Sequence, residues 1–236
     1  MTDPVALTAR LDGVRTRVAD AARRAGRLPS SIRLIAVSKT FSAEDVRTAA
    51  AAGQLDFGEN KLQEAQQKIA ATSDLPLRWH FIGHLQSNKA RKAAGLFHVI
   101  HSIDTPTLLE TIEKTARENN RAVDVLVQVD LAGEATKYGA TPDALLPIFE
   151  AASRHTFARI VGLMLLPPAV DDPEQARPYF AAVRALRDDL QRQGVPATAL
   201  SELSMGMSHD FEIAIEEGAT MIRVGTAIFG ARTYLR

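Results

Sequence analysis

The sequence predicts an α/β protein of one domain, residues 1–236, folded as a single (β/α)8 barrel of the TIM type with an extra amino-terminal helix. Roughly eight short apolar segments alternate with amphipathic ones, which is typical of a parallel sheet covered by helices. Residues 34–37 are all apolar, as expected of a strand buried on both faces. The length of 236 residues also suits such a barrel. An open, doubly wound sheet remains the alternative, because barrel closure cannot be read from a sequence.

The first elements follow from helical spacing and from glycines that end helices. Residues 4–26 are predicted to form the extra helix, because Leu7, Leu11, Val14 and Val18 recur at spacings of three and four and Gly26 can end it. A strand follows at residues 32–39. The next helix is predicted at residues 42–53, with acidic residues in its first turn.

The later elements continue this alternation. Proline stands at two helix starts, Pro106 and Pro142, glycine ends two helices at Gly194 and Gly218, and residues 123–129 are rich in β-branched side chains. Further strands are predicted at residues 55–58, 78–83, 97–103, 123–129, 160–165, 202–205 and 220–225, with the strand at 202–205 the weakest. Further helices are predicted at residues 60–71, 88–94, 108–119, 142–153, 174–193 and 208–217.

The composition excludes several classes of protein. With 28 basic and 28 acidic residues the formal net charge is +0, so we expect no binding to nucleic acid. The absence of cysteine excludes disulfides, thiol catalysis and cysteine metal sites, and it fits a reducing compartment. No apolar run is long enough to cross a membrane, and residues 1–17 show no secretory signal. We therefore expect a cytoplasmic protein. A monomer is our working expectation, although the sequence says little about oligomeric state.

Lys39 is the first candidate for chemistry. It stands at the carboxyl end of a buried parallel strand, where α/β barrels and open α/β sheets place their reactive groups. An ionised lysine is rarely buried unless it is paired or used. The alternative, that the side chain of Lys39 leaves the sheet and extends into water, remains open from this segment alone.

Two segments near the carboxyl terminus predict a phosphate site. Ser204 and Ser208 supply hydroxyls around a glycine after the seventh strand, and Gly225 and Thr226 follow the eighth. Barrels often bind phosphate with these two loops, and we expect Ser208 to open a helix whose free N–H groups attract an anion. We call Ser204, Ser208, Gly225 and Thr226 the phosphate cup. Alternatively, the serine is only a helix cap and the glycines form turns.

Two further polar residues are candidates for the site, Arg223 inside the predicted strand 220–225 and Asn60 after the strand 55–58. Arg223 is in phase with Gly225 and so shares its strand face, where an arginine needs a partner or a ligand. A salt bridge at the barrel rim is the alternative. Asn60 could line a ligand pocket, but it stands three residues before Gln63 and so also resembles a helix cap.

A lysine opposite a phosphate cup suggests a phosphorylated aldehyde as ligand, and pyridoxal 5′-phosphate (PLP) fits. A free lysine amine has a pKa near 10.4, and burial or a nearby cation such as Arg223 would lower that pKa toward useful nucleophilicity. We expect no metal site, because His80 and His84 lie on a strand and loop without a third ligand. The sequence contains no Walker loop, no Gly-x-Gly-x-x-Gly and no Gly-x-Ser-x-Gly motif.

Five motifs in order resemble the YggS/PROSC family of pyridoxal-phosphate homeostasis proteins, over about residues 32–232. The motifs are Ala-Val-Ser-Lys-Thr at 36–40, Phe-Gly-Glu-Asn at 57–60, His-Phe-Ile-Gly-His-Leu-Gln-Ser-Asn-Lys at 80–89, Ser-Met-Gly-Met-Ser-His-Asp at 204–210 and Arg-Val-Gly-Thr-Ala-Ile-Phe-Gly at 223–230. The resemblance implies a fold like the amino-terminal barrel of alanine racemase and of eukaryotic ornithine decarboxylase.

The resemblance also implies roles for single residues. Lys39 would hold PLP as an internal aldimine, Arg223 would face the pyridine nitrogen, and Asn60 would line the ring pocket. An arginine there would keep the ring nitrogen unprotonated and weaken the cofactor as an electron sink. The phosphate would lie in the cup of Ser204, Ser208, Gly225 and Thr226, with Met205 also among the cofactor-binding residues. Lys137 matches a lysine-bearing segment of the family and would be a transfer or secondary site, unless it is a solvated loop lysine.

The implied function is to bind PLP and hand it on, in the homeostasis of vitamin B6 and amino acids, without robust catalysis. Its expected partners are PLP and apo forms of PLP-dependent enzymes, and we assign no catalytic residue. One alternative is a small PLP-dependent racemase or decarboxylase, but Tyr138, Tyr179 and Tyr234 are not placed as an obvious opposing base. Another alternative is an aldolase barrel that forms a Schiff base without a cofactor.

Overall fold

The strands close into a barrel. The computed structural model describes residues 3–131 and 138–231. Within them, eight parallel strands pair in the order β1-β2-β3-β4-β5-β6-β7-β8, and β8 pairs with β1. The predicted closed barrel is thereby confirmed over the open sheet. The strands are β1 Arg33–Val37, β2 Asp56–Glu59, β3 Arg78–Phe81, β4 Val99–Ile103, β5 Val123–Val129, β6 Ala158–Leu165, β7 Glu202–Met207 and β8 Met221–Val224.

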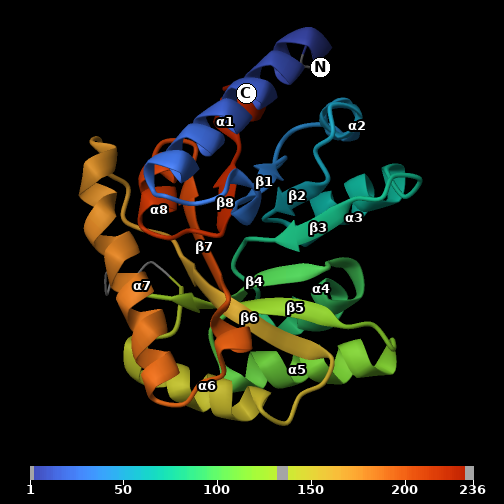
Figure 1. The fold of residues 1–236 in the computed structure, drawn as a ribbon. Helices are drawn as coiled ribbons and strands as arrows, with labels where there is room; N and C mark the ends of the chain where they lie inside the picture. The colour runs from blue at the N-terminus through green and yellow to red at the C-terminus, as the bar shows by residue number, and fades with distance from the viewer. Residues whose placement is uncertain (1–2, 132–137, 232–236) are drawn as a thin grey trace.

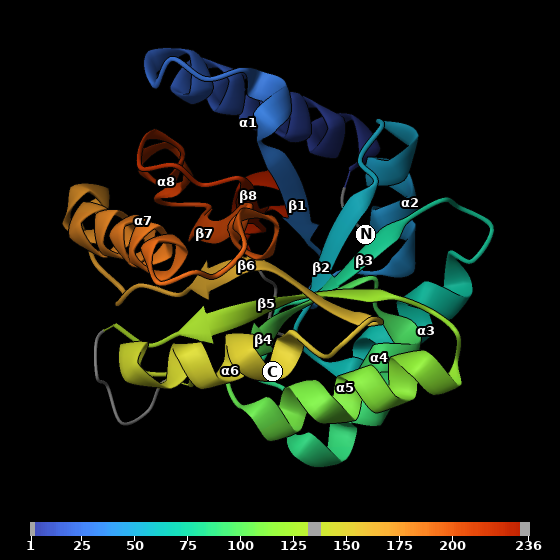
Figure 2. The same cartoon turned by 60° about the horizontal axis from the view of Figure 1, so that its bottom comes forward.

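Helices surround this barrel (Figures 1 and 2). They are α1 Pro4–Arg24, α2 Ala43–Ala51, α3 Leu62–Ala71, α4 Ala90–Leu96, α5 Pro106–Glu118, α6 Leu145–Ala152, α7 Arg177–Arg192, α8 Phe211–Glu216 and α9 Thr226–Phe229. Short 3-10 segments are η1 Pro29–Ser31, η2 Ser87–Lys89, η3 Pro142–Ala144, η4 Pro173–Ala176 and η5 Ala197–Leu200. Among the described residues, no helix is both long and apolar enough to cross a membrane.

The extra helix α1 covers the seam where the barrel closes. Asp3 caps it, because its carboxylate accepts a hydrogen bond from the N–H of Val5. The apolar stripe that includes Leu7 and Leu11 is buried, and α1 packs against α2, α8 and α9. Figure 1 shows α1 beside β1, β8 and α8, so the first and last units of the chain are held together.

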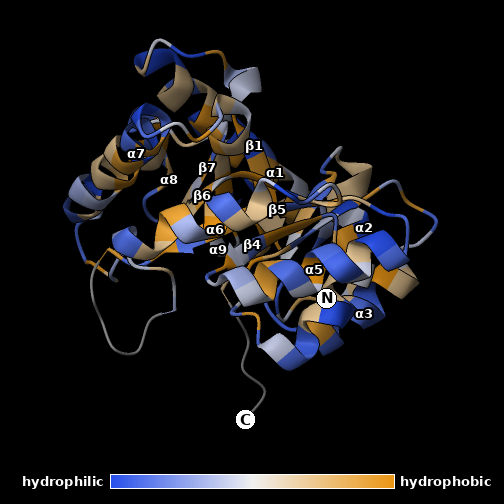
Figure 3. Cartoon of the chain, turned by 90° about the horizontal axis from the view of Figure 1, so that it is seen from below, coloured by the Kyte–Doolittle hydropathy of each residue, from blue (hydrophilic) through white to orange (hydrophobic). Residues whose placement is uncertain are grey.

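Two hydrophobic cores hold the layers together. The larger core lies between the barrel wall and the helices, whose hydrophobic bands alternate with hydrophilic ones along α5 and α6 (Figure 3). A smaller core fills the barrel interior and consists of Ile35, Val99, Leu126, Met164 and Met221. The interior is therefore packed, and polar groups inside it need partners of their own.

The structure differs from the sequence prediction mainly at element ends near the carboxyl side of the barrel. The helix predicted from Ser208 begins only at Phe211, because residues 208–210 form turns. The helix predicted from Asn60 begins at Leu62. The short helix α9 was not predicted, and β6 begins at Ala158 rather than at residue 160.

Candidate functional site

Lys39 follows β1 in a turn at the carboxyl end of the barrel. It is half-buried, between the fully buried Ser38 and the exposed Thr40. The turn brings Thr40 to a φ of 71°, a left-handed conformation that a β-branched residue rarely adopts. Such a conformation persists only where the surroundings hold it. The position of Lys39 therefore depends on what fixes the residues on either side of it.

A buried lysine fixes this turn. Lys68 Nζ, on α3, donates to the Ser38 carbonyl at 2.6 Å, to Glu59 Oε1 at 2.7 Å and to Glu64 Oε1 at 2.6 Å. Glu59 Oε1 also accepts from the Ser38 hydroxyl, and Glu64 Oε1 accepts from the Thr40 N–H. All three ammonium donors are thus used. We call Ser38, Thr40, Glu59, Glu64 and Lys68 the Lys68 cluster.

Electrostatics make this cluster sensitive to any lost partner. Glu59 is completely buried, and within the described part of the chain its Oε2 has no hydrogen-bond partner. Burial raises the pKa of Glu59, while the charge and hydrogen bond of Lys68 act against that rise. The cluster escaped the sequence prediction, although Glu64 and Lys68 stand four residues apart on a helix, the spacing of an ion pair.

Asn60 lies just after β2, half-buried and outside the following helix. A Cβ atom added at Gly83 would stand 2.3 Å from the carbonyl oxygen of Asn60. Only glycine fits there, so the chain after β3 can lie directly against Asn60. The structure thus places Asn60 at the same end of the barrel as Lys39, just after the neighbouring strand β2.

The phosphate cup is assembled differently from the sequence prediction. The Ser208 hydroxyl oxygen accepts hydrogen bonds from the N–H groups of Gly225 at 3.0 Å and Ala227 at 3.4 Å. The exposed Thr226 lies between them as the first residue of α9. Backbone donors therefore gather at the start of α9, and the expectation that Ser208 opens a helix is wrong.

A bulge gives the chain before Ser208 its direction. Between Ser204 and Met207, β7 spends three residue steps against two steps of β8. Gly206 in this bulge has a φ of 91°, and an added Cβ would stand 2.6 Å from the Cβ of Ala214. Such a bulge bends its strand, and the Ser208 hydroxyl that follows it accepts a hydrogen bond from the Gly225 N–H.

Ser204 and Met205 are both completely buried. The Ser204 hydroxyl is bonded to Arg223 on one side and to His101 Nδ1, at 2.8 Å, on the other. The Met205 side chain belongs to the outer hydrophobic core. Their assignment to the cofactor stays a prediction. The contacts of Ser204 lie inside the barrel, whereas Met205 packs between the barrel wall and the helices.

Arg223 is 3% exposed and lies inside the barrel. It donates to Ser204 Oγ at 2.5 Å and to the Leu165 carbonyl at 2.8 Å. Burial lowers its pKa to about 10, against the charge of Asp210. Among the described residues no carboxylate forms an ion pair with Arg223, so the predicted alternative of a rim salt bridge finds no partner there.

These residues fit a phosphorylated aldehyde such as PLP. The N–H groups of Gly225 and Ala227 already hold one oxygen atom, that of Ser208, which shows that they converge on a point where an oxygen can sit. Gly225 stands against Val37, since an added Cβ would lie 3.3 Å from the Val37 carbonyl oxygen. Lys39 is only two residues from Val37, so amine and anion site belong to adjacent strand ends.

The opposite side of this mouth holds a small cavity of about 140 Å³, lined in part by Ile82, His84, Gln128 and Tyr138. The rings of His84 and Tyr138 are stacked, with centroids 3.4 Å apart. The two histidines considered as metal ligands lie in different surroundings, because His84 is exposed whereas His80 is buried in β3. Within the described residues, no three His, Asp or Glu side chains form a group that could hold a metal ion.

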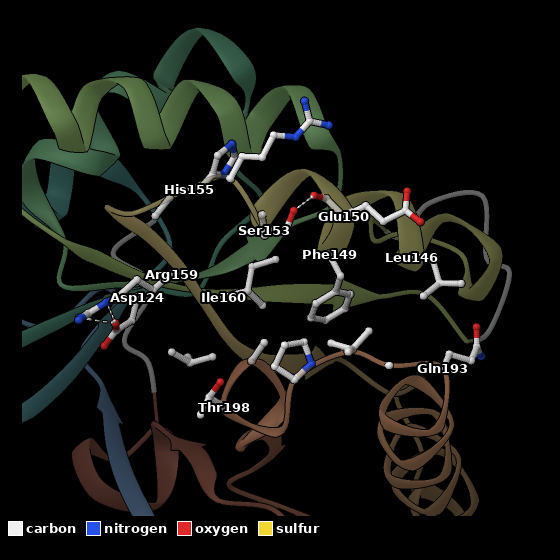
Figure 4. Close-up of a pocket in the computed structure, with 18 residues that line it drawn as sticks. Asp124, Leu146, Phe149, Glu150, Ser153, His155, Arg159, Ile160, Gln193 and Thr198 are labelled. Atoms are coloured by element: carbon white, nitrogen blue, oxygen red, sulfur yellow. Dashed lines mark hydrogen bonds and ion pairs between the residues drawn. The ribbon is translucent and has the colours of Figure 1, made fainter.

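A larger cavity, of about 920 Å³, lies away from this mouth, on the amino-terminal side of the barrel between α6, β6 and the segment before β7 (Figure 4). Phe149 and Ile160 lie at its centre, and the Asp124–Arg159 ion pair lies at one edge. None of the predicted site residues lines it. Lys137, the predicted transfer site, falls outside the described residues.

Comparison with known proteins yields consistent relatives. The family description "Alanine racemase, N-terminal domain" matches residues 10–233. A pyridoxal phosphate homeostasis protein of Aquifex aeolicus is 46% identical over 225 residues, 95% of this chain and 98% of the relative. A protein of the same name from Pseudomonas aeruginosa is 44% identical, over 94% of each chain.

Solved structures agree with this pattern. PipY of Synechococcus elongatus, solved with PLP bound, superimposes with a TM-score of 0.85 at 42% identity and covers 95% of this chain and 100% of its own. The alanine racemase of Corynebacterium glutamicum superimposes with a TM-score of 0.71 at 19% identity, over 98% of this chain and 61% of the racemase. The latter similarity concerns the fold alone.

Proposed function

Because this chain belongs to the alanine racemase N-terminal domain family, we propose that it binds PLP through Lys39 and serves the homeostasis of this cofactor. The resemblance noted from its motifs is thereby confirmed. The observation that carries the proposal is the pair of backbone N–H groups, of Gly225 and Ala227, that holds an oxygen beside the strand bearing Lys39. The PLP-bound structure of PipY, at 42% identity, supports the same reading.

Each residue of the site has a task that its chemistry supports. Lys39, once deprotonated, adds its amine to the aldehyde carbon of PLP, a C=N bond replaces the C=O bond, and the oxygen leaves as water. Ser208, Gly225 and Thr226 hold the phosphate with hydroxyl and N–H donors. Asn60 lines the ring.

Arg223 decides what the bound cofactor can do. A guanidinium carries only donors and, with a pKa lowered to about 10, it remains charged at neutral pH. If it faces the ring nitrogen, Arg223 would donate a hydrogen bond to that nitrogen and disfavour its protonation. PLP normally acts as an electron sink, and an unprotonated ring weakens that action. The site therefore favours holding and releasing PLP over catalysis on amino acids.

Apo forms of PLP-dependent enzymes are the proposed recipients. The PLP-dependent racemase or decarboxylase is the less supported alternative, because the similarity to racemases concerns the fold alone, whereas the relatives at up to 46% identity are named as homeostasis proteins. Cytoplasmic location and a monomeric state stay predictions from the sequence, and sedimentation or gel filtration of the pure chain tests the second.

The test is whether the chain carries PLP on Lys39. Wild-type protein incubated with PLP and freed of excess is expected to show a visible absorbance band, and borohydride reduction should attach the cofactor to the Lys39 peptide in a mass spectrum. Lys39→Ala should lose the adduct while its thermal unfolding stays close to wild type. Lys92→Ala, at an exposed lysine of α4, is the matched control.

Two outcomes would contradict the proposal. A wild-type chain that takes up no PLP would leave the cofactor-free aldolase as the better reading. Loss of the α-deuterium of an amino acid at rates far above free PLP would favour the racemase or decarboxylase.

A further inference from the structure

A row of buried polar side chains crosses the interior of the barrel. Arg223 contacts Ser204, and the Ser204 hydroxyl lies 2.8 Å from His101 Nδ1. His101 Nε2 lies 2.9 Å from His80 Nδ1, and His80 Nε2 lies 2.9 Å from Asp56 Oδ1. These five residues come from β8, β7, β4, β3 and β2, and we call them the interior chain.

The interior chain links the two ends of the barrel. Asp56 is the first residue of β2 and so lies at the amino-terminal mouth of the barrel. Together with Arg33 it lines a cavity of about 420 Å³ that is also lined by residues of α1. Arg223 lies two residues before Gly225 of the phosphate cup. Between them, His80, His101 and Ser204 are completely buried, so each depends on its neighbours in the chain for hydrogen bonds.

Both histidines have lowered pKa values, which favours their neutral forms at pH 7. Burial lowers the pKa of His80, against the hydrogen bond and charge of Asp56, and burial lowers the pKa of His101 well below its usual value. A neutral imidazole has one nitrogen that donates and one that accepts. If one nitrogen of such a histidine donates a hydrogen bond, its other nitrogen must accept one, so the tautomer of each histidine fixes the direction of both of its bonds.

Asp56 sets that direction at one end. Burial alone would raise the pKa of Asp56, but the hydrogen bond from His80 and the charges of Arg33 and Arg78 lower it, so the carboxyl is ionised and only accepts. His80 Nε2 must then carry the proton, which leaves Nδ1 to accept from His101 Nε2.

The other end agrees with this direction. With Nε2 protonated, His101 Nδ1 accepts from the Ser204 hydroxyl, and the Ser204 oxygen accepts from the donor-only Arg223. Every bond in the interior chain therefore points from the cation toward the anion. A neutral residue at position 56 would leave only Arg223 to impose the order.

We propose that Asp56 is a positioning residue for Arg223: through His80, His101 and Ser204 it orients one chain of hydrogen bonds that holds Arg223 as a fixed donor toward the cofactor ring. This inference rests on the proposed binding of PLP beside Arg223. It assigns a part in cofactor binding to a carboxylate at the far mouth of the barrel.

The experiment compares two carboxylates of that mouth. Asp56→Asn removes the charge and keeps the shape, and Asp124→Asn does the same at a side chain of similar exposure, 18% against 23%, whose partners are Arg78 and Arg159. Among the described residues, the Asp124 side chain forms no hydrogen bond or ion pair with the interior chain, so it controls for a general effect of charge at this mouth.

The first readout needs no cofactor. Nitrogen-15 spectra of histidine in the full chain, assigned with His80→Gln and His101→Gln, are expected to show both residues protonated only at Nε2. Asp56→Asn should give mixed tautomers at both histidines, because an amide can donate as well as accept. Asp124→Asn should keep the wild-type tautomers.

The second readout is the dissociation constant of PLP, followed by the absorbance of the bound cofactor. Asp56→Asn should raise the dissociation constant of PLP about tenfold, because one charge-assisted hydrogen bond is lost. Asp124→Asn should change this constant less than about twofold. Unchanged tautomers and affinity in Asp56→Asn, or an equal loss in Asp124→Asn, would overturn the proposal. Failure of the wild type to take up PLP would instead overturn the proposed function, and would be seen before any variant is made.

Discussion

The position of a candidate site residue depends on the side chains that hydrogen-bond to its neighbours. Lys39 was predicted as the reactive amine from its place after a buried strand, but the structure adds that Lys68 and Glu64 hold the turn that carries it. Thr40 keeps its left-handed φ of 71° only under that constraint. Lys68, which is not a predicted reactive residue, is thus part of the candidate site, because it fixes the backbone on either side of Lys39.

Substitution of Lys68 by methionine is expected to destabilise the fold strongly. Lys68→Met leaves the fully buried Glu59 without its cation, and breaking a buried pair costs about 3–5 kcal/mol. The uptake of PLP should fall as well, because the turn of Lys39 loses its support. Urea unfolding and PLP titration measure the two effects.

A paired variant and a control make this prediction specific. Lys68→Met combined with Glu59→Gln should recover part of the lost stability, since no charge is then left buried at position 59. Lys92→Met, at an exposed lysine, should change stability by less than about 0.5 kcal/mol. If Lys68→Met and Lys92→Met changed the free energy of unfolding equally, the Lys68 cluster would not stabilise the fold.

Strand ends and short connections, rather than whole helices, build the site. The bulge of β7 at Gly206 and the short helix α9 bring Ser208 to the backbone donors of Gly225 and Ala227. A helix beginning at Ser208 was predicted from the usual preference of serine for helix starts, and the turn at residues 208–210 overrides that preference. The element that offers its N–H groups therefore follows β8 instead of β7.

Gly206→Ala tests the bulge against a matched glycine. Both Gly206 and Gly194 have a left-handed φ, 91° and 97°, but an added Cβ meets Ala214 at 2.6 Å only at Gly206. Gly194→Ala should cost about 1–2 kcal/mol for the backbone conformation alone. Gly206→Ala should cost about 1–3 kcal/mol more for overpacking, and it should weaken PLP binding. Equal unfolding midpoints in urea for the two variants would refute this account.

The whole molecule balances charge across the barrel interior. Carboxylates and arginines close the amino-terminal mouth, as in the pairs Arg78–Asp124 and Arg159–Asp124. The interior chain of polar groups then runs beside the small apolar core to Arg223. Burial of two neutral histidines in this chain makes stability depend on pH.

Stability is expected to fall as the pH drops below about 6.5. His80 and His101 have lowered pKa values in the folded state, so their contribution is complete above the unfolded pKa near 6.5 and is lost as the pH falls toward the folded values. In that window each unfolded histidine binds a proton that the folded one does not. The free energy of unfolding should change by up to about 1.4 kcal/mol per pH unit for each histidine.

The variant His101→Gln isolates this effect. Glu59, Asp104 and Asp210 have pKa values raised by burial, so they oppose the histidines by favouring the folded state as the pH falls. In the wild type, the change of the free energy of unfolding with pH combines these opposing contributions. The difference between the wild type and His101→Gln gives the contribution of His101. Urea unfolding between pH 7.5 and 5 should show a smaller slope in the variant, and equal slopes would contradict the assignment.

The order of strands and helices could be predicted from the sequence, because apolar periodicity, glycine and proline act over a few neighbours. The strand at residues 123–129 matches β5 residue for residue, and Lys39, Asn60, Ser208, Gly225 and Thr226 stand at the carboxyl ends of strands. Barrel closure, the Lys68 cluster and the interior chain depended on the tertiary structure. They join residues such as Ser204 and His101, 103 positions apart, and no local pattern records which distant polar groups will be buried together and must satisfy one another.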